Sequence, residues 1–277
     1  MIQNFSTNDH TLQQIADMLM LNGLITDRTG LVHGKTGIAI FFFHYARYTG
    51  NELFEDYAMD LFGEIRSQIH KNSQVDYEEG IAGIGIGIDY LVQNKFLMPE
   101  GDIFKDFDDR MYRAVMFDTW QDFSLYEGLT GYGKYWLMRL RHQTSSMLAR
   151  DCLLHINSQI EEKLEHISEQ VLTDVHCFLH DIAQIHEFKD HLVKLINPRL
   201  DFFRLGNSTV GNIARMYQNC YYFNSNMDNV DNALKQALDL VMEKQPSGTG
   251  LLNGYAGEGM LCLTALNKNN ISWMHLL

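Results

Sequence analysis

The sequence predicts an all-α fold, an α/α-toroid of about six helical hairpins with one hairpin incomplete, in a single domain of residues 1–277. Three observations support this fold: a glycine motif that recurs along the chain, an apolar segment after each motif, and an amphipathic segment between motifs. Only three of the 277 residues are proline, so long uninterrupted helices are permitted.

The motif consists of a polar residue, a glycine, any two residues and a second glycine. Its copies end at residues 37, 83, 131, 184, 211 and 257, so their spacings are 46, 48, 53, 27 and 46 residues. A period near 48 has room for two helices and two loops, whereas the spacing of 27 predicts an irregular ring between residues 190 and 206. The copies, of which the fourth and fifth are degenerate, are His33–Gly37, Glu79–Gly83, Glu127–Gly131, His180–Gln184, Asn207–Gly211 and Asn253–Gly257.

The segments after the motifs are apolar on nearly all sides, which predicts inner helices that are buried all round. These helices are expected to begin near Gly37, Gly83, Gly131, Ile182, Gly211 and Gly257. The glycines are expected to let neighbouring inner helices approach closely.

The segments between the motifs have apolar residues at helical spacing and charge on one face only, as outer-layer helices do. Repeated in a ring, outer and inner helices give a toroid with the motif loops at one mouth. The clearest outer stripes are Leu53, Tyr57, Leu61 and Ile65, and then Ala233, Leu234, Ala237, Leu238 and Val241.

Acidic residues outnumber basic residues by 35 to 22, and a formal charge of −13 repels phosphate backbones. The composition therefore argues against general nucleic-acid binding and is compatible with a basic peptide partner. The N-terminal segment lacks the basic and apolar regions of a secretory signal, and the apolar run Ile38–Phe43 is too short to span a bilayer. We expect a cytoplasmic protein without a membrane span, in which the four scattered cysteines are reduced.

The polar residue before each motif turn is the candidate ligand-binding position, because all copies are expected to line the same mouth. The alternative is that about half of these residues only cap helix N-termini. The candidate binding residues are His33, Glu79, Tyr126, Glu127, Asp181, Asn207 and Asn253, with His180 as the candidate catalytic residue.

The motifs resemble those of the lanthionine synthetase C-like family, the cyclases of lanthipeptide biosynthesis. The segment GLVHGKTGIAIFFFHYAR is similar to the family's first motif, YEGLTGYGKYWLMRL to its third, and GLLNGYAGEGMLCLTAL to its last. The resemblance runs from about residue 20 to the end. It implies an α/α-barrel of seven hairpins whose lumenal zinc, held by two cysteines and one histidine, activates a substrate thiol for addition to a dehydrated Ser or Thr.

This sequence departs from the family pattern at the zinc ligands. Gly206 and Asn207 stand where the family's Cys and His would be, and the motif that carries the third ligand is missing. Because of this departure we expect no zinc and no other cofactor in this chain. The resemblance carries over His180, which the family uses for proton transfer, next to an Asp181 that replaces a glycine. Ser124 occupies the position of a family aspartate, with Asp122 two residues earlier.

The favoured interpretation is a cyclase-like protein without zinc-dependent activity that acts in binding or maturation of a ribosomal peptide, with a peptide or a partner modifying enzyme as its partner. One alternative is a peptide-modifying enzyme that works without zinc, with His180 as acid–base. Another is a glycoside-processing barrel that uses Glu79 and Glu127 as its carboxylate pair, although only Trp120, Trp136 and Trp273 could stack on sugars. A new metal site has weak support from spacing alone, at His176, Cys177 and His180 or at His186, Glu187 and His191.

Overall fold

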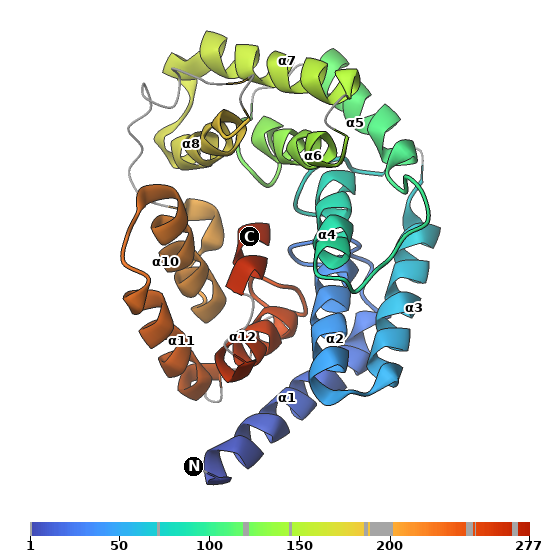
Figure 1. Ribbon diagram of the computed structural model, residues 1–277, viewed down its shortest axis with the longest axis vertical. Coiled ribbons are helices and arrows are strands. Elements are labelled where there is room, and N and C mark those ends of the chain that lie inside the picture. Colours follow the sequence, from blue (N-terminus) through green and yellow to red (C-terminus); the bar gives the residue numbers. More distant parts are fainter. Residues whose placement is uncertain are drawn as a thin grey trace. The chain divides into compact units, whose positions relative to one another are not determined.

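The computed structural model is helical throughout the part of the chain that it describes, with no strand there and one isolated β-bridge between Gly248 and Gly254 (Figure 1). The prediction of an all-α fold is confirmed for these residues. No helix among them has the length and apolar character needed to cross a membrane. The described residues are 2–70, 73–118, 122–143, 146–185, 188, 202–241, 246, 248–267 and 271–277.

The chain folds into two compact units, unit 1 with Met1–Ser73 and Leu205–Leu277, and unit 2 with Gln74–Arg204. The single-domain organisation stays a prediction. The described helices of unit 1 are α1 (Ile2–Gly23), α2 (Lys35–Thr49), α3 (Glu52–Gln68), α10 (Thr209–Phe223), α11 (Asp228–Val241), α12 (Tyr255–Asn267) and η4 (Ile271–Leu276). Those of unit 2 are α4 (Ile81–Gln93), α5 (Lys105–Phe117), α6 (Leu129–His142), α7 (Met147–Lys163), η1 (Leu164–His166) and α8 (Glu169–Ala183), and the short η3 (Phe203–Leu205) joins the two units.

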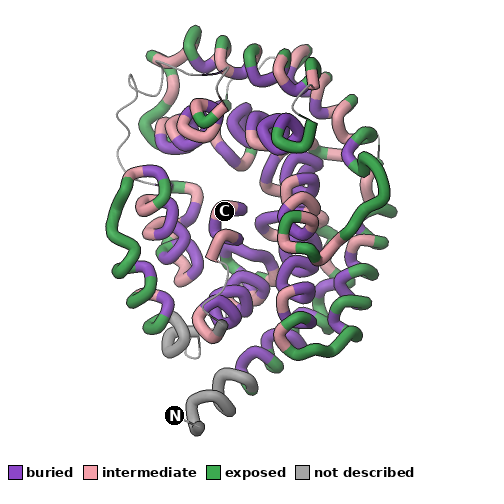
Figure 2. Tube along the Cα trace, viewed as in Figure 1, coloured by how far each residue is buried: buried purple, intermediate pink, exposed green. Residues whose placement is uncertain are grey.

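Largely buried helices alternate with helices that are buried on one side only (Figure 2). In unit 1, α2 is buried from Lys35 through Phe43, whereas α3 buries only a stripe that packs on α2. The ring of Phe42 lies 6.1 Å from that of Phe54 and 4.7 Å from that of Tyr57. The prediction that Leu53 belongs to this stripe is wrong, because it is 68% exposed and the helical spacing to Tyr57 and Leu61 is met by Phe54 instead.

Five inner helices begin where the motifs predict, each two residues before the motif's last glycine. The N-cap of α2 is Gly34, with an extended backbone, and a Cβ atom there would lie within 3.0 Å of the backbone of Gly30. The same conflict with the residue four positions earlier exists at the other complete motifs. Glycine is therefore required by the tight approach of each loop to its own helix start. The equivalent glycines are Gly80, Gly128 and Gly254.

The fourth predicted helix start is wrong. No helix begins near Ile182, because His180–Gln184 lies at the C-terminal end of α8, which begins at Glu169 after Ser168. This segment has no glycine to interrupt a helix, so α8 continues through it. The predicted irregular stretch from 190 to 206 falls largely outside the described residues.

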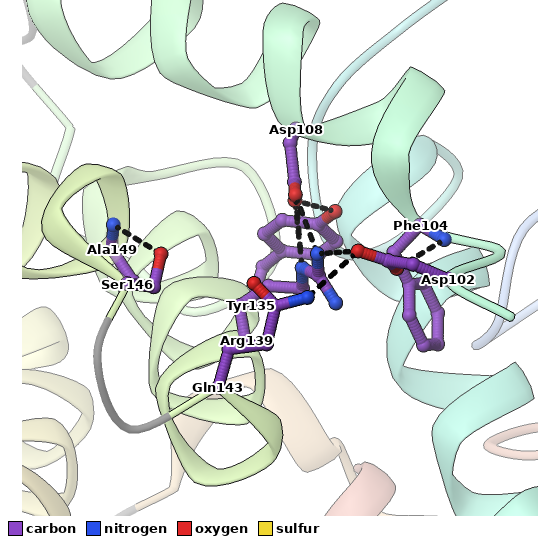
Figure 3. Close-up of polar contacts among 8 residues, drawn as sticks. All are labelled: Asp102, Phe104, Asp108, Tyr135, Arg139, Gln143, Ser146 and Ala149. Carbon is purple, nitrogen blue, oxygen red and sulfur yellow. Dashed lines mark hydrogen bonds and ion pairs between the residues drawn. The ribbon is translucent and has the colours of Figure 1, made fainter.

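One face of α6 is fixed to α5 and to the segment before it by a paired arginine (Figure 3). The Arg139 guanidinium donates hydrogen bonds to Asp108 at 2.6–3.1 Å and to Asp102 at 2.7 Å. The Tyr135 hydroxyl donates to Asp108 at 2.7 Å, and the Arg139 guanidinium lies over the ring of Phe104. Burial disfavours the charged Asp102, but hydrogen bonds from Arg139, the Phe104 amide and Gln143 outweigh it and lower the Asp102 pKa.

Candidate functional site

Adjacent motif loops are joined by the same backbone hydrogen bonds in both units. In unit 2, the Tyr126 carbonyl accepts hydrogen bonds from the amides of Tyr77 and Glu78 at 2.9 and 3.2 Å. In unit 1, the Val32 carbonyl accepts from the amides of Leu251 and Leu252 at 2.8 and 3.3 Å. Both carbonyls belong to the residue two positions before the motif's first glycine. The sequence repeat is therefore also a repeat of geometry, and we call these contacts the loop ties.

The loop before α6, which accepts through the Tyr126 carbonyl, also donates a hydrogen bond, and its acceptor is a side chain. The amide of Leu125, which occupies the position of Tyr77 and Leu251, donates to Asp174 Oδ2 at 3.0 Å. Because α8 has no motif loop before it, a side-chain carboxylate in the middle of α8 takes the role of the missing carbonyl. Asp174 in turn forms an ion pair with Arg204, and the two side chains are 7% and 8% exposed.

The Arg204 guanidinium also lies over two aromatic rings. Its guanidinium lies 5.9 Å from the ring centre of Tyr126 and 5.0 Å from that of Phe202. The Tyr126 hydroxyl is buried and has no hydrogen-bond partner in the described part of the chain. Burial raises the pKa of Tyr126 despite the nearby Arg204 charge, so this hydroxyl stays protonated.

Lys134 on α6 faces the same charged group. It lies within electrostatic reach of Asp181, Arg204, Cys177 and Asp174. Burial lowers the pKa of Lys134 and raises that of Cys177 to about 12, so both the ammonium and the thiolate are disfavoured. Asp181 Oδ1 lies 3.7 Å from Nδ1 of His180. We call Tyr126, Lys134, Asp174, Cys177, Asp181 and Arg204 the polar cluster.

The predicted site residues fall into both units. Glu79, Tyr126, Glu127, His180 and Asp181 belong to unit 2, and His33, Asn207 and Asn253 belong to unit 1. In unit 2, Glu79 and Glu127 follow the two loops that share a tie, and Glu127 is exposed. His180 and Asp181 lie near the C-terminal end of α8 and not in a motif loop, and Asp181 joins the polar cluster.

The alternative that the polar residues of the motifs cap helix N-termini does not hold for α2, α4 and α6. The N-cap residues of α2, α4 and α6 are Gly34, Gly80 and Gly128, one position after His33, Glu79 and Glu127. In the degenerate fifth motif the cap is Ser208, whose Oγ accepts a hydrogen bond from the Gly211 amide at 3.0 Å. Asn207 precedes this cap and is exposed.

The residues at the family's zinc positions do not fit a zinc ion. Gly206 offers no side-chain donor, and its φ of 59° lies in the left-handed region, where a cysteine would be strained. Asn207 is exposed and its amide is a poor zinc ligand. In the described residues no group of three His, Cys, Asp or Glu side chains is arranged to hold a metal ion. The alternative ligands His186, Glu187 and His191 lie outside those residues.

The motif search missed Lys134, Asp174 and Arg204. The sequence does contain one indication of Lys134, because it is a charged residue inside the apolar segment YGKYWL after the third motif. Asp174 and Arg204 meet across 30 residues of sequence, so no local pattern pairs them.

Compared with known proteins, the chain matches no family model and none of the curated sequences. The functional assignment therefore rests on these residues and their geometry.

Proposed function

We propose that the chain is a lanthionine synthetase C-like α/α-toroid that acts in binding or maturation of a ribosomal peptide and has no zinc-dependent cyclase activity. The observation that carries this proposal is the loop tie, since equivalent backbone contacts at Val32 and Tyr126 hold equivalent motif residues in place. The residue before each first glycine is the position that we propose contacts the ligand. The absence of thiol or imidazole donors at Gly206 and Asn207 is the reason for proposing binding rather than cyclisation.

The charge of the motif loops favours a basic peptide. The two loops that are joined by the Tyr126 carbonyl carry three carboxylates, those of Glu78, Glu79 and Glu127. The whole chain carries a formal charge of −13. Carboxylates grouped in this way attract Lys and Arg side chains, with a strength that salt reduces.

A fluorescent decapeptide of alternating Lys and Ser residues tests this proposal. We expect the double variant E79Q/E127Q to weaken binding about tenfold at low salt, as measured by anisotropy, because two favourable charge pairs are lost. The matched control is E162Q, an exposed glutamate of α7, which is expected to leave the affinity unchanged. Equal binding by wild type and the double variant would refute a role for the motif loops.

A second candidate is glycoside processing, which the tie between the loops of Glu79 and Glu127 favours because it brings two carboxylates of unit 2 into neighbouring loops. Hydrolysis of p-nitrophenyl glycosides by wild type but not by E79Q or E127Q would support this function. Turnover that survives both substitutions, or no turnover at all, would reject it.

A further inference from the structure

Exposed apolar side chains gather at the C-terminal end of α1 and in the turn that follows it. Five of the eight residues 18–25 are large apolar residues that stay exposed, and Leu21 and Ile25 are 68% and 76% exposed. A single exposed apolar residue is ordinary on a protein surface, whereas a group of them is typical of a contact site for another molecule. The five residues, which we call the apolar end of α1, are Met18, Met20, Leu21, Leu24 and Ile25.

Hydrogen bonds hold the apolar end of α1 in place and connect it to α3. The Ile25 amide donates to the Asn22 carbonyl at 3.2 Å. The Tyr57 hydroxyl of α3 lies 3.2 Å from the Leu19 carbonyl and 3.1 Å from the Met20 carbonyl. Both helices also pack on α2 (Figure 1). The exposed side of α3 next to Tyr57 therefore borders the apolar end of α1.

That side of α3 is acidic. At about 100° per residue, Asp56 and Asp60 both lie beside Tyr57 in the direction away from the buried stripe of α3. Both aspartates are exposed, and Asp60 lies within electrostatic reach of the Tyr57 hydroxyl. Glu64 lies on the same side, but its carboxylate is 3.7 Å from Nζ of Lys35. We call Asp56 and Asp60 the acidic border.

The charge around the apolar end of α1 decides which partner fits it. The last turn of α1 contains no basic residue, so its carbonyl dipoles add to the negative charge of the acidic border. Asp27 and Arg28, which follow the turn, carry opposite charges. The complement of this surface is an amphipathic segment with Lys or Arg beside apolar residues. Its negative charge disfavours an anionic lipid surface and a second copy of this acidic chain.

We propose that the apolar end of α1 and the acidic border form a docking surface for a basic amphipathic segment of a partner protein. Apolar side chains of the partner pack on Leu21 and Ile25, and its Lys or Arg side chains approach Asp56 and Asp60. The docking surface lies entirely in unit 1 and contains no residue of a motif loop. It is therefore separate from the peptide site of the proposed function.

A labelled peptide tests the docking surface. The probe is a fluorescein-labelled peptide of about 14 Leu and Lys residues in an amphipathic helical pattern. All proteins carry E79Q/E127Q, so the motif-loop carboxylates do not contribute to binding. Anisotropy should show affinity about tenfold lower after L21S/I25S, which removes two apolar anchors. We expect D56N/D60N to lower it about tenfold at low salt and less at high salt.

A matched control separates the docking surface from any exposed surface. L154S/D151N removes an exposed leucine and an exposed aspartate of α7 and should leave the affinity unchanged. The same peptide with Glu in place of Lys should bind at least about tenfold more weakly. Equal affinity with and without L21S/I25S would overturn the proposal, whatever the motif loops do with the Lys and Ser decapeptide. Failure here is therefore distinct from failure of the proposed function.

The same variant tests two other partners for the docking surface. We expect the chain and its L21S/I25S variant to have the same mass in sedimentation equilibrium, and neither to sediment with phosphatidylcholine vesicles, with or without phosphatidylserine. A dimer that L21S/I25S dissociates would assign the surface to a second copy and overturn the proposal. Vesicle binding that L21S/I25S abolishes would assign it to lipid, with the same consequence.

Discussion

The surroundings of the cation differ between the two faces of α6, which carry the buried Arg139 and the half-buried Lys134. Arg139 on one face has two carboxylates, an aromatic ring and short hydrogen bonds around it, whereas Lys134 on the other has charged neighbours but no direct partner among the described residues. The two residues are five positions apart, which places them about 140° apart around the helix. A paired buried charge fixes structure, whereas a half-buried amine without a direct partner costs stability.

The largest effect is expected at the paired face. Replacing Arg139 by Leu leaves the carboxylates of Asp108 and Asp102 without their cation, so we expect the free energy of unfolding to fall by about 3 kcal/mol. Urea denaturation measures the change. The matched control is R141L, an exposed arginine of the same helix, which should change stability by less than about 0.5 kcal/mol. A small effect of R139L would show that the two faces do not differ in this way.

A glycine next to Lys134 tests the packing of the second face. A Cβ atom at Gly133 would lie within 3.0 Å of the ring of the fully buried Phe178 on α8, so G133A should destabilise the fold by about 1–3 kcal/mol. The control is G63A in the middle of α3, where nothing lies within 4 Å and alanine should stabilise by about 0.5–1 kcal/mol. Both changes are measured by thermal and urea unfolding, and a stabilising G133A would mean that α6 and α8 pack loosely.

Removing the unpaired amine should have the opposite sign to removing Arg139. We expect K134M to increase the free energy of unfolding by about 1 kcal/mol at pH 7, because a poorly solvated amine is replaced by an apolar side chain of similar length. K105M, at an exposed position of α5, is the control. A clear loss of stability in K134M would reveal a partner for the amine.

The pH dependence of stability sharpens the same comparison. The folded pKa of Lys134 lies below the unfolded value near 10.4, so between these values the unfolded state binds more protons. Wild-type stability should therefore rise with pH through this window relative to K134M, and the gap between the two proteins should close as pH approaches 10. Urea midpoints from pH 6 to pH 10 measure this convergence. A gap that stays constant would place the pKa of Lys134 at its ordinary value.

The smallest effect is expected from metal. Added zinc or EDTA should leave the unfolding midpoint unchanged, and elemental analysis should find no stoichiometric zinc, because Gly206 and Asn207 supply no suitable ligand. Burial also raises the pKa of Cys177 to about 12, which disfavours the thiolate that zinc needs. One zinc per chain, bound by Cys177 and His180, would place a cation beside Lys134 and revive the enzyme interpretation.

The helix starts could be predicted because each is fixed by a local steric requirement. Gly34 and its equivalents lie against the backbone four residues earlier, and such a requirement is written in the sequence as glycine at a fixed spacing. The start near Ile182 was wrong because α8 begins without a glycine loop, at Ser168. Leu53 was assigned to the wrong face because Phe54 fits the same helical spacing equally well.

The candidate site was predictable only in part. Tyr126 and Asp181 were identified from their places beside the motif copies, and both belong to the polar cluster. Asp174 and Arg204 were missed because their roles arise from contacts with Leu125 and with each other, across 49 and 30 residues. Pairings of that range depend on how helices pack, which no motif spacing encodes.

The loop ties separate the scaffold from its variable positions. A tie is made entirely by backbone atoms, so exchange of the side chains at His33, Glu79 and Glu127 leaves the hydrogen bonds of the tie in place. The loop positions therefore form an interchangeable set, suited to altering ligand preference by substitution or by design. The junction at Asp174 is the exception, because there the inter-loop bond depends on one carboxylate, and diversification of the chain must leave that residue in place.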